Sequence, residues 1–118
     1  MEDMHDEPVR AVPDEEHAQI AASTFRMLSD PTRVKILWLL FREESSVNAL
    51  AESVGAPSAA VSQHLAKLRL AGLVQSRKEG TFAYYRASDA HVRRLLVETL
   101  SHAEHVTGAA EAADPHSY

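Results

Sequence analysis

The spacing of apolar residues along the chain has a helical period in five stretches and a period of two in one. The helical stretches predict five helices, over 14–28, 31–41, 47–54, 58–71 and 89–106. Before the last helix the period changes to two over 73–78 and 81–86, and Glu79-Gly80 supplies the turn of a β-hairpin. The predicted fold is therefore mainly α with a β-hairpin wing, in the order ααααββα.

The helix over 31–41 begins with two residues that favour a helix start. Asp30 is a good N-cap, and Pro31 suits the first helical position because its missing N–H would have no partner there. The second half of this helix is apolar on nearly every side. We therefore expect it at the centre of the domain.

Two short helices in the middle of the chain are joined by a tight turn. Gly55 ends the first helix, and residues 56–58 lead directly into the second. On the second helix Val61, Leu65 and Leu68 lie at i, i+4 and i+7 and so share one face. This arrangement is typical of a helix-turn-helix, and the hairpin and helix that follow make it a winged helix-turn-helix.

The chain has 118 residues, which is the length of one small domain. We expect a disordered acidic leader over 1–13, a folded unit over 14–106 and a flexible tail over 107–118. The longest apolar run, Ile36 to Phe41, is far shorter than the roughly 20 residues that cross a bilayer, and the acidic N-terminus lacks the basic region of a signal peptide. A soluble cytoplasmic protein that binds no membrane is expected.

Charge and cysteine content narrow the chemistry. The net charge of −5 argues against a nucleic-acid partner when taken alone, but residues 1–16 carry −6 and residues 55–88 carry +4. The chain has no cysteine, which excludes disulfides, thiolate metal sites and cysteine nucleophiles, so metal ligands have to come from its seven histidines and its carboxylates. The basic residues alone also fit an ordinary solvated surface, and only their placement favours a binding surface.

The second helix of the helix-turn-helix has the features of a DNA-recognition helix. Small Ser58 and Ala59 at its start permit a close approach to base edges, where Ser62 and Gln63 offer hydrogen bonds. Cationic side chains on either side are candidates for phosphate contacts with double-stranded DNA: Lys67, Arg69, Arg77, Lys78 and Arg86. The alternative is a winged-helix interaction module that binds a partner without DNA.

Four segments resemble one family of regulators. They are Leu28 to Leu37 (LSDPTRVKIL), Val61 to Leu68 (VSQHLAKL), Ala71 to Val74 (AGLV) and Arg77 to Gly80 (RKEG). Over residues 15–106 the chain is similar to the ArsR/SmtB family of bacterial metal-sensing repressors. The resemblance implies a homodimer on an operator with two-fold symmetry, with the helix over 58–71 in the major groove and the hairpin as its wing. It also implies that the base-facing positions are Ser58, Ala59, Ser62 and Gln63.

The last helix carries four candidate metal ligands in two pairs. Asp89 and His91 lie near its start, and His102 and His105 lie near its end. His91 and His102 share a face but are separated by roughly 16 Å of helix rise, so one chain cannot close both around one ion. The pairs Asp89/His105 and His91/His102 have nearly the same midpoint, at residues 96 and 97. An antiparallel copy of the helix in a homodimer would therefore complete two equivalent sites.

Three imidazoles and one carboxylate oxygen form a tetrahedral set, for which zinc is the default ion and cobalt a close mimic. The ArsR/SmtB resemblance agrees, because this pattern matches the fifth-helix site of the family's zinc, cobalt and nickel sensors, whereas its third-helix site needs cysteines. His5 and His116 are candidates for extra ligands, which would raise the coordination number to six and favour nickel. Alternatively, the histidines are solvated and Asp89 is only an N-cap. His64 is expected to be packed or to contact phosphate rather than to bind metal.

These patterns predict a transcriptional repressor that binds operator DNA as a metal-free dimer and releases it when zinc binds. Metal across the last helices would fix the angle between the recognition helices, and a dimer that reads half-sites about 34 Å apart tolerates little change in that angle. The resemblance implies that the non-ligating nitrogen of His102 donates to a backbone carbonyl near Gly72. The alternative is a nickel or cobalt sensor of the same fold.

An enzyme is the least favoured class. A zinc hydrolase needs an open coordination position for water, and here all four positions are taken by protein atoms. We therefore expect no enzyme activity and no small organic substrate.

Overall fold

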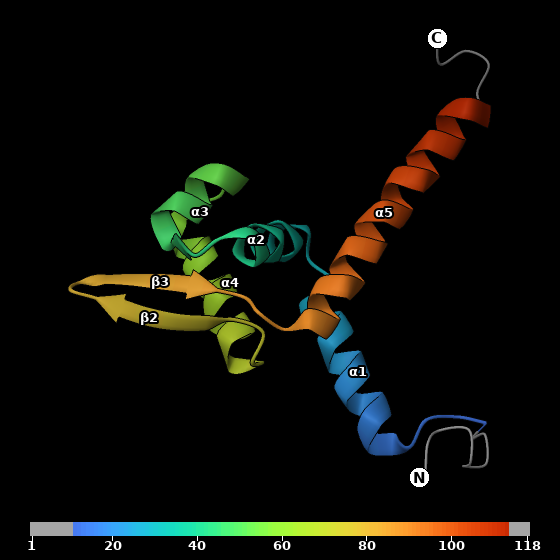
Figure 1. Cartoon of the computed structure of the whole chain (residues 1–118), viewed down its shortest axis with the longest axis horizontal. Helices are drawn as coiled ribbons and strands as arrows, with labels where there is room; N and C mark the ends of the chain where they lie inside the picture. Colours follow the sequence, from blue (N-terminus) through green and yellow to red (C-terminus); the bar gives the residue numbers. More distant parts are fainter. Residues whose placement is uncertain (1–10, 114–118) are drawn as a thin grey trace.

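The computed structural model describes residues 11–113 (Figure 1). Its elements are, in order, α1 (Glu15–Met27), α2 (Pro31–Arg42), β1 (Ser45–Ser46), α3 (Val47–Val54), α4 (Ser58–Leu70), β2 (Gln75–Glu79), β3 (Phe82–Arg86) and α5 (Ala90–Ala113). The five helices and the hairpin follow the predicted order, and the short strand β1 is an addition to it. His5, His116 and the segments 1–10 and 114–118 of the predicted leader and tail lie outside the described residues.

Helix boundaries follow the capping residues. The carboxylate of Asp30 accepts a hydrogen bond from the backbone N–H of Arg33 at 3.0 Å, and Pro31 occupies the first turn of α2. Gly55 ends α3 with a φ of 71°, a left-handed conformation in which a side chain would be strained. These local signals explain why α2 begins and α3 ends at the residues that the sequence predicts.

The hydrophobic core is built around α2. From this helix Ile36, Leu37 and Leu40 are at most 2% exposed. The fully buried side chains that meet them come from α3 and α4: Leu50, Val61, Leu65 and Leu68. Burying one aliphatic side chain of this size contributes about 1.5–3 kcal/mol, so the cluster holds the helix-turn-helix firmly against α2. The central position predicted for α2 is confirmed.

The hairpin belongs to a three-stranded antiparallel sheet with the strand order β1-β3-β2. Ser45 of β1 pairs with Tyr85, and Ser46 pairs with Tyr84. The hydroxyl of Ser46 also caps α3 by accepting a hydrogen bond from the N–H of Ala49 at 3.2 Å. A strand of two residues has no alternation to detect, which is why the sequence did not predict it. It joins the wing directly to the start of the helix-turn-helix.

The hairpin turn lies one residue later than predicted. Glu79 is still part of β2 and pairs with Phe82, so the turn consists of Gly80 and Thr81, with a φ of 64° at Gly80. A glycine suits this left-handed position because it has no Cβ. Strand β2 also begins later than expected, at Gln75. The two residues before it, 73 and 74, are buried in the core.

Helix α5 is longer than the sequence predicts. It extends to Ala113, seven residues beyond the expected end at Val106. The hydroxyl of Thr107 donates to the backbone carbonyl of Glu104 at 2.9 Å, which satisfies this polar side chain within the helix. Residues 109–113 are mostly alanine, which has the highest helix propensity of all residues. Residues 107–113 of the expected flexible tail are therefore helical.

Helices α1 and α5 each have much of their length outside the core, although Val92 and Leu96 of α5 belong to it and Met27 of α1 packs against it. In Figure 1 they project in opposite directions from one end of the molecule, while the wing points away from them at the other end. No residue of α1 is buried, and within residues 90–109 of α5 the buried residues are Val92 and Leu96. Among residues 11–113, no helix combines the length and apolar character that a bilayer crossing requires. The wing and the pair of helices α1 and α5 thus lie at opposite ends of the molecule (Figure 1).

Candidate nucleic-acid interface and metal ligands

Helix α4 turns one face to the core and the other to solvent. The predicted base-facing residues are all exposed: Ser58, Ala59, Ser62 and Gln63. The hydroxyl of Ser58 donates to the side-chain oxygen of Asn48 in α3 at 3.0 Å, which joins the two helices at their turn. Ser62 and Gln63 form no side-chain hydrogen bond within residues 11–113. Their polar groups are therefore available for base edges.

Four of the five predicted phosphate-contacting residues are exposed and form no ion pair with any described residue: Lys67, Arg69, Lys78 and Arg86. Two of them lie in the last turn of α4 and two lie in the strands of the wing. The segment 71–74 connects α4 directly to β2, so the two pairs of cations lie on elements that follow one another along the chain. They remain candidates for phosphate contacts.

Arg77 is the exception among the predicted phosphate contacts. Its Nε and Nη2 donate to the two carboxylate oxygens of Glu44 at 2.9 and 2.8 Å, and its Nη1 donates to Glu79 at 3.0 Å. The guanidinium also lies 5.0 Å from the centroid of the Tyr84 ring. Hydrogen bonding to Arg77 lowers the pKa of Glu44 below its ordinary value, and the Glu44 and Glu79 carboxylates raise the pKa of Arg77. Sequence reasoning missed this pairing because Glu44 and Arg77 are 33 residues apart.

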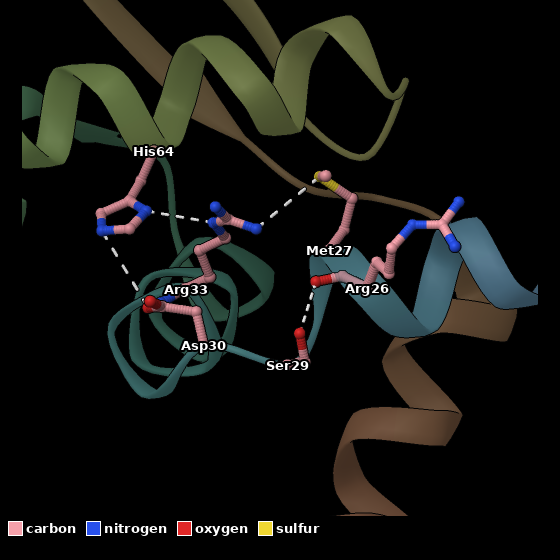
Figure 2. A network of polar contacts seen from close by, with 6 residues as sticks. All are labelled: Arg26, Met27, Ser29, Asp30, Arg33 and His64. Atoms are coloured by element: carbon pink, nitrogen blue, oxygen red, sulfur yellow. Dashed lines mark hydrogen bonds and ion pairs between the residues drawn. The ribbon is translucent and has the colours of Figure 1, made fainter.

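A polar network joins α4 to the start of α2 (Figure 2). Nε of Arg33 donates to Nδ1 of His64 at 3.1 Å, and Nε2 of the same ring lies 4.0 Å from a carboxylate oxygen of Asp30. Nη1 of Arg33 also reaches the sulfur of Met27, at the end of α1, at 3.9 Å. The His64 side chain is 20% exposed. Of the two roles expected for His64, packing within the protein is the one that the structure shows.

The four predicted metal ligands are exposed on α5 or directly before it: Asp89, His91, His102 and His105. Oδ1 of Asp89 accepts hydrogen bonds from the backbone N–H groups of His91 and Val92 at 2.8 and 3.0 Å and so caps α5. Its Oδ2 forms no hydrogen bond with any residue in 11–113. The ring of His91 lies 3.0 Å from Nη2 of Arg94. Within the described part of one chain, no three His, Cys, Asp or Glu side chains come together as a metal site.

Comparison with known proteins shows what kind of regulator carries these features. Residues 30–76 match the sequence model of the family described as bacterial regulatory protein, arsR family. The transcriptional regulator KmtR of Mycobacterium tuberculosis is 52% identical over 86 residues, which cover 73% of this chain and 66% of KmtR. A cadmium resistance transcriptional regulatory protein of Staphylococcus aureus, a CadC homolog, is 38% identical over 72% of this chain and 71% of its own length. The chain belongs to the arsR family of bacterial regulatory proteins.

A solved structure of a possible ArsR-family regulator has the same fold. A homodimeric winged helix-turn-helix DNA-binding domain from Mycobacterium bovis, a possible ArsR-family regulator, matches with a TM-score of 0.69 and 30% identity over 92% of this chain and 99% of that domain. The winged helix-turn-helix fold and the ArsR/SmtB resemblance are therefore confirmed. As an arsR-family member, the chain is a DNA-binding transcriptional regulator, and its relatives are regulators rather than enzymes.

Proposed function

We propose that this arsR-family member is a metal-responsive repressor that binds operator DNA as a metal-free homodimer and releases it when zinc binds. The arrangement of ligands on α5 carries the proposal. Two pairs of exposed ligands lie near residues 90 and 104 of one helix, and no metal site forms within the described part of a single chain. A second α5, crossing antiparallel at residues 96 and 97, would bring each pair against the opposite pair. A metal response also agrees with the cadmium resistance role named for the CadC homolog.

The outer faces of α1 and α5 supply a surface for the second copy. Ile20 and Phe25 on α1 are 58% and 57% exposed, and Val97 and Val106 on α5 are 37% and 50% exposed. Several large apolar side chains on two neighbouring, weakly packed helices are typical of an interaction surface. The homodimeric relative from Mycobacterium bovis supports this assembly. A two-fold axis near Val97 would bury these side chains and form both metal sites at once.

The donor set fits zinc. Three imidazole nitrogens and one carboxylate oxygen suit a four-coordinate zinc site, and the free Oδ2 of Asp89 could bind metal while Oδ1 keeps its capping role. The chain has no cysteine, so a cadmium site built from thiolates is excluded. Cobalt would take the same tetrahedral site. Nickel would require six ligands, with His5 and His116 as the candidates for the additional two.

Metal at α5 is coupled to DNA through the core. Val92 and Leu96 of α5 belong to the same buried cluster as α2 and the apolar face of α4. Because a close-packed core transmits rigid-body changes, a metal that fixes the angle between two α5 helices also fixes the separation of the two α4 helices. Half-sites about 34 Å apart allow little variation in that separation. A hydrogen bond from the non-ligating nitrogen of His102 to a carbonyl near Gly72 would reinforce the link.

On the DNA side, the exposed face of α4 would enter the major groove. Ser62 and Gln63 would then read base edges, with Ser58 and Ala59 allowing the close approach. The four unpaired cations would contact phosphates on either side: Lys67, Arg69, Lys78 and Arg86.

The test uses the full chain and a duplex selected from random DNA by the metal-free protein. Zinc should weaken wild-type binding about tenfold or more, a coupling of at least about 1.4 kcal/mol. His102→Ala should bind the duplex normally without zinc and should fail to release it with zinc. His17→Ala removes an exposed histidine from α1 and is the matched control, which should respond as wild type does. Zinc-induced release that persists in His102→Ala, or that is absent from the wild type, would overturn the proposal.

A further inference from the structure

Arg77 lies at the centre of a cluster of four side chains on one face of the sheet. Arg77 pairs with Tyr84 in the β2–β3 register, Glu79 follows two residues later on the same strand face, and Glu44 precedes β1 on the opposite side of β3. Of the five N–H donors of a guanidinium, three are used: two donate to Glu44 and one to Glu79. The ring of Tyr84 lies under the same group. We call these four residues the Arg77 cluster.

The cluster joins the wing to the segment that precedes the helix-turn-helix, in addition to the hydrogen bond from Ala87 N–H to the Leu40 carbonyl and the packing of Tyr85 on the core. Glu44 belongs to the segment that leads from α2 into β1 and α3, whereas Arg77 belongs to the wing. Within residues 11–113, the Arg77–Glu44 contact is the only ion pair between the wing and the rest of the chain. The pairing of β1 with β3 adds only two residue pairs. The two parallel hydrogen bonds fix the orientation of the guanidinium relative to the carboxylate as well as their distance. They therefore restrain the angle between the wing and the rest of the fold.

The electrostatics of the cluster oppose a phosphate. Two carboxylates surround one guanidinium, so the cluster carries a net negative charge, and the pKa of Glu44 is held below its ordinary value by the hydrogen bonds from Arg77. Side-chain exposure is 50% for Arg77 and 30% for Glu44. A DNA phosphate would find only two N–H donors of Arg77 unused, and it would approach them against the negative charge of both carboxylates. Lys78 on the same strand has no such competitor within residues 11–113.

We propose that Arg77 is a positioning residue for the wing and does not bind phosphate, and that Glu44 is its partner in this role. By tying β2 to the segment before β1, the pair sets where Lys78 and Arg86 lie relative to the recognition helix. The effect on operator binding rests on the proposed function. The restraint of the wing does not, because it is a property of the free protein.

The first experiment measures amide hydrogen exchange of β2 and β3 in the free, full-length protein. Arg77→Ala and Glu44→Gln should each speed exchange in the two strands several-fold, because each variant breaks the bidentate contact. Lys78→Ala is the matched control on the same strand and should exchange at the wild-type rate. Wing amides that stay as protected in both variants as in the wild type would overturn the proposal. This readout does not depend on DNA, so it is separate from any failure of the proposed function.

The second experiment measures affinity for the selected duplex as a function of salt. A positioning role predicts that Arg77→Ala and Glu44→Gln each weaken binding several-fold, that the double variant is no weaker than either, and that the salt slope stays unchanged. A phosphate contact predicts the opposite: Arg77→Ala would lower the slope by about 0.9, and Glu44→Gln would strengthen binding by freeing Arg77. Lys78→Ala should show the reduced slope of a true phosphate contact. Tighter binding by Glu44→Gln would therefore refute the proposal.

Discussion

Arg33 in α2 donates a hydrogen bond to the ring of His64 in α4 at 3.1 Å, although the two residues are 31 positions apart. The same guanidinium reaches the sulfur of Met27 at the end of α1. One side chain of α2 thus contacts both α1 and α4, and α4 is the helix that we propose to read DNA (Figure 2). The position of the recognition helix in the fold therefore depends on a polar contact as well as on the aliphatic core.

Replacing His64 with alanine should lower the free energy of unfolding by about 1 kcal/mol, because the half-buried Nε–H of Arg33 loses its acceptor. Urea unfolding followed by circular dichroism measures the change. His17→Ala removes a histidine whose side chain is 76% exposed and serves as the control, with little expected effect. Equal losses of stability in the two variants would contradict a specific role for the Arg33–His64 contact.

Asp30 makes stability dependent on acid pH. The backbone N–H of Arg33 is the largest cause of its lowered pKa, and the backbone N–H of Thr32 adds to it. Because the folded-state pKa lies below the unfolded value, the stabilisation is complete above the unfolded pKa of about 3.9 and is lost as pH falls through the folded pKa. Asp30→Asn keeps a good N-cap without a titratable group. Its melting temperature should be lower than that of the wild type at neutral pH and should fall less steeply below about pH 4, and parallel curves would refute this assignment.

Local signals predicted most of the fold. The N-cap at Asp30, the left-handed Gly55 and the apolar spacing on α4 each act within a few residues, so a single sequence displays them. The contacts that were not predicted connect distant segments, as in the pairing of Ser46 with Tyr84 and of Glu44 with Arg77. Such contacts depend on how strands and loops pack against each other in the folded chain. The spacing of residues in the sequence does not predict which distant segments pack together.

The candidate sites divide in the same way. Exposure of the DNA-facing residues on α4 and of the ligands on α5 follows from the helical period, and the structure has these side chains exposed. Arg77 looked like any other cation of the wing, because its two carboxylate partners become neighbours only in the folded sheet. The meeting of the two ligand pairs on α5 needs a second chain. It stays a prediction that metal titration has to test.

Asp89→Asn separates the capping role of Asp89 from its role as a metal ligand. Asparagine caps a helix as well as aspartate does, but its neutral amide oxygen is a weaker ligand for zinc or cobalt. The wild type should bind one cobalt per protomer with the intense visible bands of a tetrahedral complex. Asp89→Asn should keep the wild-type helix content and bind cobalt at least about tenfold more weakly.

Two results would change the assignment of the metal site. Cobalt binding by Asp89→Asn at wild-type affinity would leave Asp89 as a cap alone. Weak octahedral bands in the wild type would favour a six-coordinate nickel-type site, and they should then become tetrahedral or vanish in the His5→Ala/His116→Ala double variant.

Gln63 and Lys67 on α4 should affect DNA binding in different ways. Lys67→Ala should weaken binding to all duplexes alike and reduce the slope of log affinity against log salt by about 0.9, because one phosphate contact is lost. Gln63→Ala should cost about 1–3 kcal/mol on the selected duplex and leave binding to random duplex unchanged. Fluorescence anisotropy over a salt series measures both. An equal loss on selected and random duplexes for Gln63→Ala would remove it from the base-reading set.

Val97 tests whether the metal response requires the dimer. It is 37% exposed in the first half of α5, where the two-fold axis is proposed, so a glutamate there would place two like charges against each other across the axis. Val97→Glu should sediment as a monomer at concentrations where the wild type is a dimer. It should also lose tetrahedral cobalt binding although all four ligands are intact, because neither chain alone brings the pairs together. Leu70→Glu replaces a side chain that is 91% exposed on α4 and should remain dimeric. Tetrahedral cobalt binding by a monomeric Val97→Glu would show that one chain suffices and would refute the site between two subunits.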